Sequence, residues 1–291
     1  MRDRVRLVPA IQPLEQRLER CHGVAELAFA SAGEGRGAAL RHLYQKTPCR
    51  VLFPRIEAGD LPTAVLLTTS GGLTGGDSIA LSVEALPGAA ATVTTQAAEK
   101  IYRALAGDVA ITLSLRVGAG AWVEWLPQET ILFEGARLAR RSEAVVAPGG
   151  RLMAGEMLVF GRRARGERFA RGRLHDAWRL RRGTELVWAD ALHFEGEVGR
   201  LIAHPAGGDG AAALALLLYV ADDAASWLEP ARDILAGSSC RAAATVVNGV
   251  LLARLIGREA QSVREGLAHL AASLRAAIAG LPARLPRVWA T

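Results

Sequence analysis

The chain has 291 residues, of which 51% are hydrophobic and 22% charged, and its formal net charge is +6. This length can bury one large core or two smaller ones without covalent staples. The three cysteines (Cys21, Cys49 and Cys240) lie far apart and form no C-x-x-C pair, so neither a disulfide framework nor a structural zinc site is indicated, and a reducing compartment fits best.

Residues 1–20 predict a polar N-terminal arm that lacks the apolar stretch of a secretory signal. The longest apolar run, residues 211–220, is about half of the roughly 20 residues that cross a bilayer, and it predicts a buried strand. We therefore expect a cytoplasmic protein without membrane segments.

A series of short strands is predicted along the next part of the chain. In residues 109–117 apolar and small or polar residues alternate strictly, which is typical of a half-buried strand. Similar runs occur at 51–56, 64–69, 79–84, 91–95, 121–126, 144–147, 152–160, 174–181 and 186–194. We predict a mainly β fold of stacked antiparallel sheets, a barrel or a β-helix-like coil, which the pattern alone does not separate.

The excess of positive charge is local. Residues 161–182 contain nine arginines and two acids, a net of +7, so the rest of the chain sums to about −1. The favoured interpretation is a solvated basic face. Docking of an acidic protein surface comes second, with Arg162, Arg163 and Arg165 as candidates, and nucleic acid comes last because a basic patch specifies no partner.

The last third changes character to α+β. A strand is predicted at 212–220, a helix at 225–236, two strands at 242–247 and 249–256 around the hairpin signal Asn248-Gly249, and a helix at about 259–279. We therefore divide the chain into the arm 1–20, a β-rich domain 21–205 and a β-α-β-β-α portion 206–291 packed on it, with few helices in all.

Three stretches concentrate polar groups and glycine. Residues 68–77 hold four glycines in six residues but no lysine of a phosphate-binding loop, so a structural turn in which Asp77 caps backbone N–H groups is the default interpretation. Residues 94–103 contain either a surface pair, Glu99 and Lys100, or part of a water-lined interior wall. Residues 122–131 predict a core corner built on two tryptophans, with the role of Glu129 left open.

Catalysis is not supported by these residues. The chain has no G-x-S-x-G or H-E-x-x-H motif, its six histidines are scattered, and Cys49 has no nearby base in the sequence. We expect a protein that is not an enzyme and that holds no organic cofactor.

Taken together and in order, five motifs resemble the urease accessory protein UreD (UreH) family. They are LYQKTPCRVLFP (43–54), SGGLTGGD (70–77), TTQAAEKIYR (94–103), WLPQETILFEGARL (125–138) and LPRVWAT (285–291). The resemblance implies a nickel metallochaperone scaffold with a β-helix-like stack of sheets. It also implies three partners: urease apoprotein, UreF, and the GTPase UreG bound through UreF.

The resemblance further implies a water-filled tunnel that nickel crosses transiently. Four acids are the candidate metal contacts on this path: Asp77, Glu99, Glu156 and Asp190. The candidate tunnel or loop residues are Ser70, Gly71, Gly72, Gly75, Gly76, Thr94, Thr95, Gln96 and Glu129, and Trp289 joins the three arginines as a candidate for partner binding. Buried carboxylates need pairing, water or a cation; the alternative is that each acid faces solvent on an edge strand.

Two rival functions remain at this point. One is an adaptor that changes the conformation of urease without conducting metal, and the other is a basic nucleic-acid-binding protein.

Overall fold

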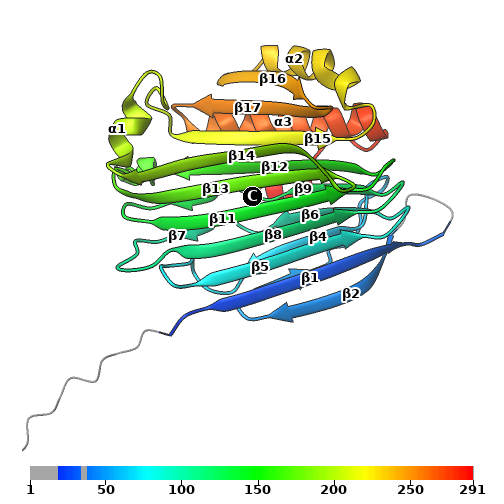
Figure 1. Cartoon of the computed structure of the whole chain (residues 1–291), viewed down its shortest axis with the longest axis horizontal. Coiled ribbons are helices and arrows are strands. Elements are labelled where there is room, and N and C mark those ends of the chain that lie inside the picture. The colour runs from blue at the N-terminus through cyan, green and yellow to red at the C-terminus, as the bar shows by residue number, and fades with distance from the viewer. Residues whose placement is uncertain (1–18, 34–37, 291) are drawn as a thin grey trace, which may run out of the picture.

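The strands form two stacked sheets in the computed structural model, which describes residues 19–33 and 38–290 (Figure 1). Sheet A has the order β14-β13-β11-β8-β5-β1-β2, and sheet B has the order β16-β17-β15-β12-β9-β6-β4-β3, with β7 and β10 pairing beside β12. The strands of sheet A are β1 (His22–Ser31), β2 (Ala38–Lys46), β5 (Ser78–Ala85), β8 (Val109–Val117), β11 (Arg137–Val146), β13 (Gly172–Arg182) and β14 (Glu185–Gly196). Those of sheet B are β3 (Cys49–Leu52), β4 (Thr63–Thr68), β6 (Ala90–Thr95), β7 (Glu99–Ile101), β9 (Trp122–Leu126), β10 (Thr130–Leu132), β12 (Arg151–Phe160), β15 (Ala213–Val220), β16 (Arg241–Val247) and β17 (Val250–Gly257).

The chain builds these sheets as a coil. From β4 to β13 it passes repeatedly from one sheet to the other, and equivalent strands of successive coils pair in parallel, as β5 does with β8 and β8 with β11. The turns between coils also stack, because Gly118 N donates to Ala85 O and Ala147 N donates to Val117 O. The prediction of a mainly β, β-helix-like fold with few helices is confirmed.

Alternating side chains of the two sheets fill the space between them. In β8 the odd-numbered residues Val109 to Val117 are buried in the inter-sheet core, and the even-numbered ones face outward. Inward residues of both sheets meet there, so a polar residue with the inward parity is placed in the middle of the protein.

The C-terminal strands extend sheet B. Strand β15 pairs antiparallel with β12, and β16 and β17 form the predicted hairpin, in which Asn248 and Gly249 adopt φ values of 47° and 75°. Helices α2 (Leu228–Ala236) and α3 (Ala260–Ala279) enclose a second core against this sheet. The other helical elements within residues 19–33 and 38–290 are α1 (Val198–Ala203) and three short 3₁₀ turns at Arg163–Arg165, Ala224–Trp227 and Arg287–Ala290.

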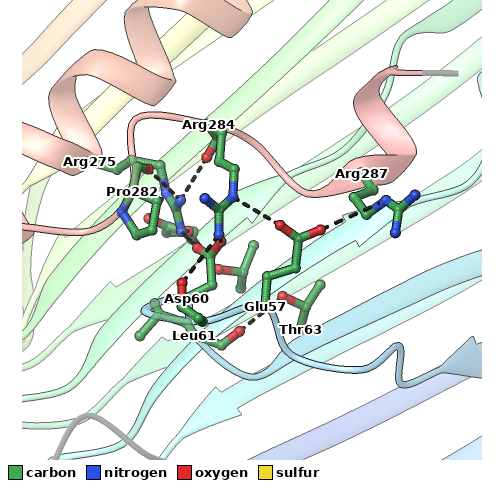
Figure 2. Close-up of polar contacts among 11 residues, drawn as sticks. Glu57, Asp60, Leu61, Thr63, Arg275, Pro282, Arg284 and Arg287 are labelled. Carbon is green, nitrogen blue, oxygen red and sulfur yellow. Dashed lines mark hydrogen bonds and ion pairs between the residues drawn. The ribbon is translucent and has the colours of Figure 1, made fainter.

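A buried ion-pair network ties the segment after α3 to the sheet (Figure 2). Arg275 donates to Glu124 Oε1 at 2.9 Å, to Asp60 Oδ1 at 2.8 Å and to two carbonyl oxygens of the following segment. Arg284 adds contacts of 3.1 Å to Asp60 and to Glu57. The network fixes the path of residues 280–290 across the outer side of sheet B.

Several elements were not predicted. Strands β1, β2, β7 and β10 and helix α1 had no matching expectation, and β11 begins at Arg137 where the pattern indicated residue 144. The predicted arm, apart from residues 19 and 20, lies outside the described residues, and the division into domains stays a prediction. Among the described helices, none has both the length and the apolar character needed to cross a membrane.

Candidate functional site: two joined cavities between the sheets

The first cavity lies between the sheets and has a volume of about 210 Å³. Its rim includes Gly71 and Gln96, both exposed, from the loops that follow β4 and β6. Its lining combines the apolar side chains Leu81 and Leu113 with the polar groups Glu99, Thr130, Arg140, Ser142 and Glu156. The cavity thus leads from the surface loops toward charged groups in the interior.

The second cavity, of about 270 Å³, lies next to the first and shares one lining residue with it. Glu156 lines both cavities, and the second is also lined by Asp176 and Asp190 and by Gly207, an exposed residue. The first cavity lies beside the loops after β4 and β6, the second lies on the side of the molecule where β14 approaches β17, and Glu156 is common to both.

Arg140 occupies the junction of the two cavities. Its Nη2 lies 2.9 Å from Glu156 Oε2 and 2.5 Å from Asp176 Oδ2, its Nε donates to Asp176 Oδ1 at 2.9 Å, and its Nη1 donates to Thr130 Oγ1 at 3.3 Å. Arg140 and Asp176 are direct neighbours on β11 and β13 of sheet A, whereas Glu156 reaches them from β12 of sheet B. The cluster therefore bridges the sheets.

The charges of this cluster are set by burial and by each other. Burial by itself lowers the pKa of Arg140, but the neighbouring Asp176 and Glu156 more than offset this and raise it, so the guanidinium stays charged. Burial raises the pKa of Glu156, and Arg140 acts in the opposite direction. The Glu156 side chain is 12% exposed, so the alternative of an acid facing solvent is wrong for this residue.

Glu99 lies in the first cavity and has a different environment. Thr68 Oγ1 donates to Glu99 Oε2 at 3.2 Å, and the backbone N–H of Lys100 donates to Oε1 at 3.2 Å. Burial raises the pKa of Glu99 to about 7, against the hydrogen bond from Thr68. Cys49 lines the same cavity, and burial, followed by the charge of Glu99, raises the pKa of its thiol to about 11, which keeps it protonated at neutral pH.

Asp190 stands at the outer end of the second cavity. It lies on the edge strand β14 with 39% of its side chain exposed, and its Oδ2 is 2.5 Å from Arg254 Nη2 on β17. This ion pair joins the two sheets at the surface.

Asp77 lies in the glycine loop and not in the lining of the two cavities. Its two carboxylate oxygens accept the N–H groups of Cys21 at 2.9 Å and of Thr74 at 2.7 Å, and it is not among the residues that line the two cavities. Asp77 thus caps the glycine loop in the way that its sequence context suggested. The same loop packs closely, since a Cβ on Gly75 would meet Ala106 O and lie 2.7 Å from Gly107 O.

The other candidate loop residues divide into three groups. Ser70, Gly71, Gly72, Thr95 and Gln96 line the first cavity. Gly75 and Gly76 belong to the loop capped by Asp77. Thr94 and Glu129 belong to the docking of the C-terminal segment: Thr94 Oγ1 donates to Leu126 O at 2.6 Å, and Glu129 pairs with Arg264 of α3 at 3.3 Å.

The candidate partner-binding residues have contacts within the chain. Trp289 is 8% exposed, its Nε1 donates to Thr94 Oγ1 and Leu126 O, and the guanidinium of Arg264 stacks on its ring. Arg162 pairs with Glu167 at 2.5 Å, and Arg163 donates to the carbonyls of residues 210 and 211. Arg165 is exposed. Arg162 is exposed as well, whereas Arg163 is half-buried.

Sequence reasoning missed Arg140 and Asp176. Strand parity carries the missing signal: Leu138, Ala144 and Val146 face inward in β11, so Arg140 and Ser142, which have the same parity, must also face inward. Asp176 shares the inward parity of Leu174 and Trp178 in the same way. The described residues contain no group of three His, Cys, Asp or Glu side chains arranged to hold a metal ion.

Comparison with known proteins places this arrangement in a family. The sequence model of the UreD urease accessory protein matches residues 21–290. The chain is 42% identical to the urease accessory protein UreD of Magnetococcus marinus over 92% of its own length and 93% of that protein, and 42% identical to that of Methylobacterium sp. (strain 4-46) over 96% and 98%. It is 39% identical to UreD of Xanthobacter autotrophicus over 97% and 95%. These matches span both cavities and both sheets, and the chain belongs to the UreD family of urease accessory proteins.

Proposed function

We propose that this protein is a nickel-delivery scaffold of urease maturation, without catalytic activity of its own, and that nickel crosses it through the two joined cavities. The observation that carries the proposal is that Glu156 lines both cavities, the first of which also contains Glu99 and the second Asp190. The Glu156 carboxylate is turned inward and is not on a solvent-facing edge.

The chemistry of the lining favours transit over storage. Ni²⁺ binds nitrogen and thiolate ligands tightly, so a lining rich in histidine and cysteine would retain the ion. Hard carboxylates, together with water, attract the cation and let it move on. Ser70 Oγ and Ser142 Oγ are buried against the first cavity with no hydrogen-bond partner among the described residues, which favours water in this part of the route.

Membership of the family supports a choice of partners. We propose that urease apoprotein docks at one mouth and UreF at the other, with the GTPase UreG bound to UreF. The nickel ion is then the cargo, and the energy of GTP hydrolysis comes from the partner.

A cavity-filling substitution tests this route against the adaptor hypothesis. Ser142→Phe fills the first cavity, whereas Glu143→Phe places the same ring on the outer face of the same strand as a matched control. Both variants are purified with urease apoprotein, UreF and UreG, complex formation is checked by size-exclusion chromatography, and the nickel content and activity of urease are measured.

A conducting route predicts that Ser142→Phe forms the complex but lowers urease nickel at least tenfold, while Glu143→Phe activates normally. Normal activation by a folded, complex-forming Ser142→Phe variant favours the adaptor and overturns the proposal.

A further inference from the structure

Arg140 closes the junction of the two cavities with a positive charge. Its guanidinium bonds Asp176 through two nitrogens and Glu156 through one, and it is buried between the sheets. A divalent cation that reaches this point from either side meets carboxylates whose lone pairs already bind a cation.

Nη2 of Arg140 is held between the oxygens of two carboxylates. This nitrogen lies between Glu156 Oε2 and Asp176 Oδ2, at 2.9 and 2.5 Å, and the neighbouring nitrogen of the guanidinium reaches Thr130 Oγ1. Four oxygens from β10, β12 and β13, two of them from Asp176, thus converge on the space that the guanidinium fills. Two carboxylates and a hydroxyl are hard oxygen donors of the kind that hold divalent cations.

The side chain also has a place to move. Arg140 lines the first cavity, and Ser142, two residues along the same strand, presents a buried hydroxyl there with no hydrogen-bond partner among the described residues. A guanidinium displaced from Glu156 finds this acceptor on the same wall. The carboxylates are then free to contact a passing ion.

We propose that Arg140 is a gate residue whose guanidinium stands in for the metal ion at Glu156 and Asp176, so that a divalent cation crosses the junction only by displacing it. The gate rests on the proposed route for nickel. The gate explains why Glu156 and Asp176 do not retain the nickel ion. Each entering ion must compete with the Arg140 guanidinium for the two carboxylates, and the guanidinium returns when the ion leaves.

Metal binding by the isolated full-length chain tests the gate without urease or partners. Removing the guanidinium in Arg140→Met uncovers the oxygen site, and we expect the affinity for Ni²⁺, measured by titration calorimetry, to rise at least tenfold with one ion bound per chain. Asp176→Asn in the same background removes one ligand and is expected to abolish the gain. Arg254→Met is the matched control, since Asp190 is left alone at an exposed mouth and gains no affinity.

A second variant decides the question if Arg140→Met does not fold. Arg140→Lys keeps a positive charge but presents a single ammonium in place of the guanidinium fork. It is expected to fold and to bind Ni²⁺ about threefold more tightly than the wild type.

Unchanged Ni²⁺ affinity in the folded variants overturns the gate, whatever the cavity-filling test gives. A gain in affinity combined with normal activation by Ser142→Phe keeps the uncovered metal site but removes the nickel route, so the two proposals fail separately.

Discussion

Arg275 Nε donates to Glu124 Oε1 at 2.9 Å and joins α3 to β9 at a point where the two side chains are 1% and 0% exposed. The same guanidinium holds Asp60 and the carbonyls of Pro282 and Arg284 (Figure 2). Arg275 of α3 thus connects β9, the loop before β4 and the segment that follows α3.

Arg275→Met is expected to lower the free energy of unfolding by about 3–5 kcal/mol, because it leaves Glu124 buried without its cation. Urea unfolding followed by circular dichroism measures the change. Arg287→Met is the control, since Arg287 approaches Glu57 at 3.8 Å with its side chain 90% exposed. Equal effects of the two substitutions would show that the buried network does not carry the stability assigned to it.

The strands of the repetitive part of the fold could be predicted from the sequence, whereas the buried charged residues between the sheets could not. Strand β8 follows from strict alternation, and the hairpin follows from Asn248-Gly249. Which strands pair does not follow, because pairing across coils depends on residues that are far apart in the sequence, as in the register of Ala80 with Thr112. Strand β2 was missed because most of its residues are exposed on both faces, so it lacks the alternation of a half-buried strand.

The candidate site was predictable only in part. Glu156 drew notice because an acid stood out in an apolar strand, whereas Arg140 was hidden in the run LARRSEAVV, where Arg141 and Glu143 suggest an exposed segment. Asp77 resembled the other acids in sequence, yet its two oxygens are used by backbone N–H groups. The alternation along a strand predicts which face a side chain lies on, but it does not predict which residue that side chain contacts.

The glycine loop supplies a steric prediction. Gly75→Ala is expected to destabilise the protein by about 1–3 kcal/mol, since the added methyl group meets two carbonyl oxygens of the facing loop. Gly71→Ala, in the same loop, meets its nearest atom, Tyr102 Oη, at 3.7 Å and is expected to change stability by less than about 0.5 kcal/mol. Thermal unfolding of both variants compares them directly, and a larger loss at Gly71 would contradict this account.

The C-terminal tryptophan gives a third prediction. Trp289→Ala is expected to cost about 3–4 kcal/mol, because it removes a buried ring together with the partner of the Arg264 guanidinium. Trp289→Phe keeps most of the packing and loses the hydrogen bonds of Nε1 to Thr94 and Leu126, so about 1–2 kcal/mol is expected. Limited proteolysis of the C-terminal segment provides a local readout: faster cleavage is expected in Trp289→Ala, and unchanged cleavage would show that the ring is not the anchor.

The raised pKa of Glu99 predicts a pH-dependent contribution to stability. Burial raises this pKa from 4.5 to about 7 in the folded protein. The folded state therefore holds the proton on Glu99 more tightly than the unfolded state. Below pH 4.5 the carboxyl is protonated in both states and does not lower the free energy of unfolding. As the pH rises from 4.5 to 7 its ionisation lowers the free energy of unfolding progressively, and above pH 7 the loss is complete.

Glu99→Gln removes the ionisable group at nearly constant shape. Relative to the wild type, the variant is expected to be more stable by on the order of 2 kcal/mol at pH 8 and equally stable at pH 4, a value reduced from the full shift because the side chain is partly exposed. Urea unfolding of both proteins from pH 4 to 8 measures this difference, and the exposed Glu143→Gln is expected to follow the wild type throughout. If Glu99→Gln is more stable than the wild type by the same amount at pH 4 and pH 8, the difference in stability comes from packing. The Glu99 carboxylate is then not held in a low-polarity part of the first cavity.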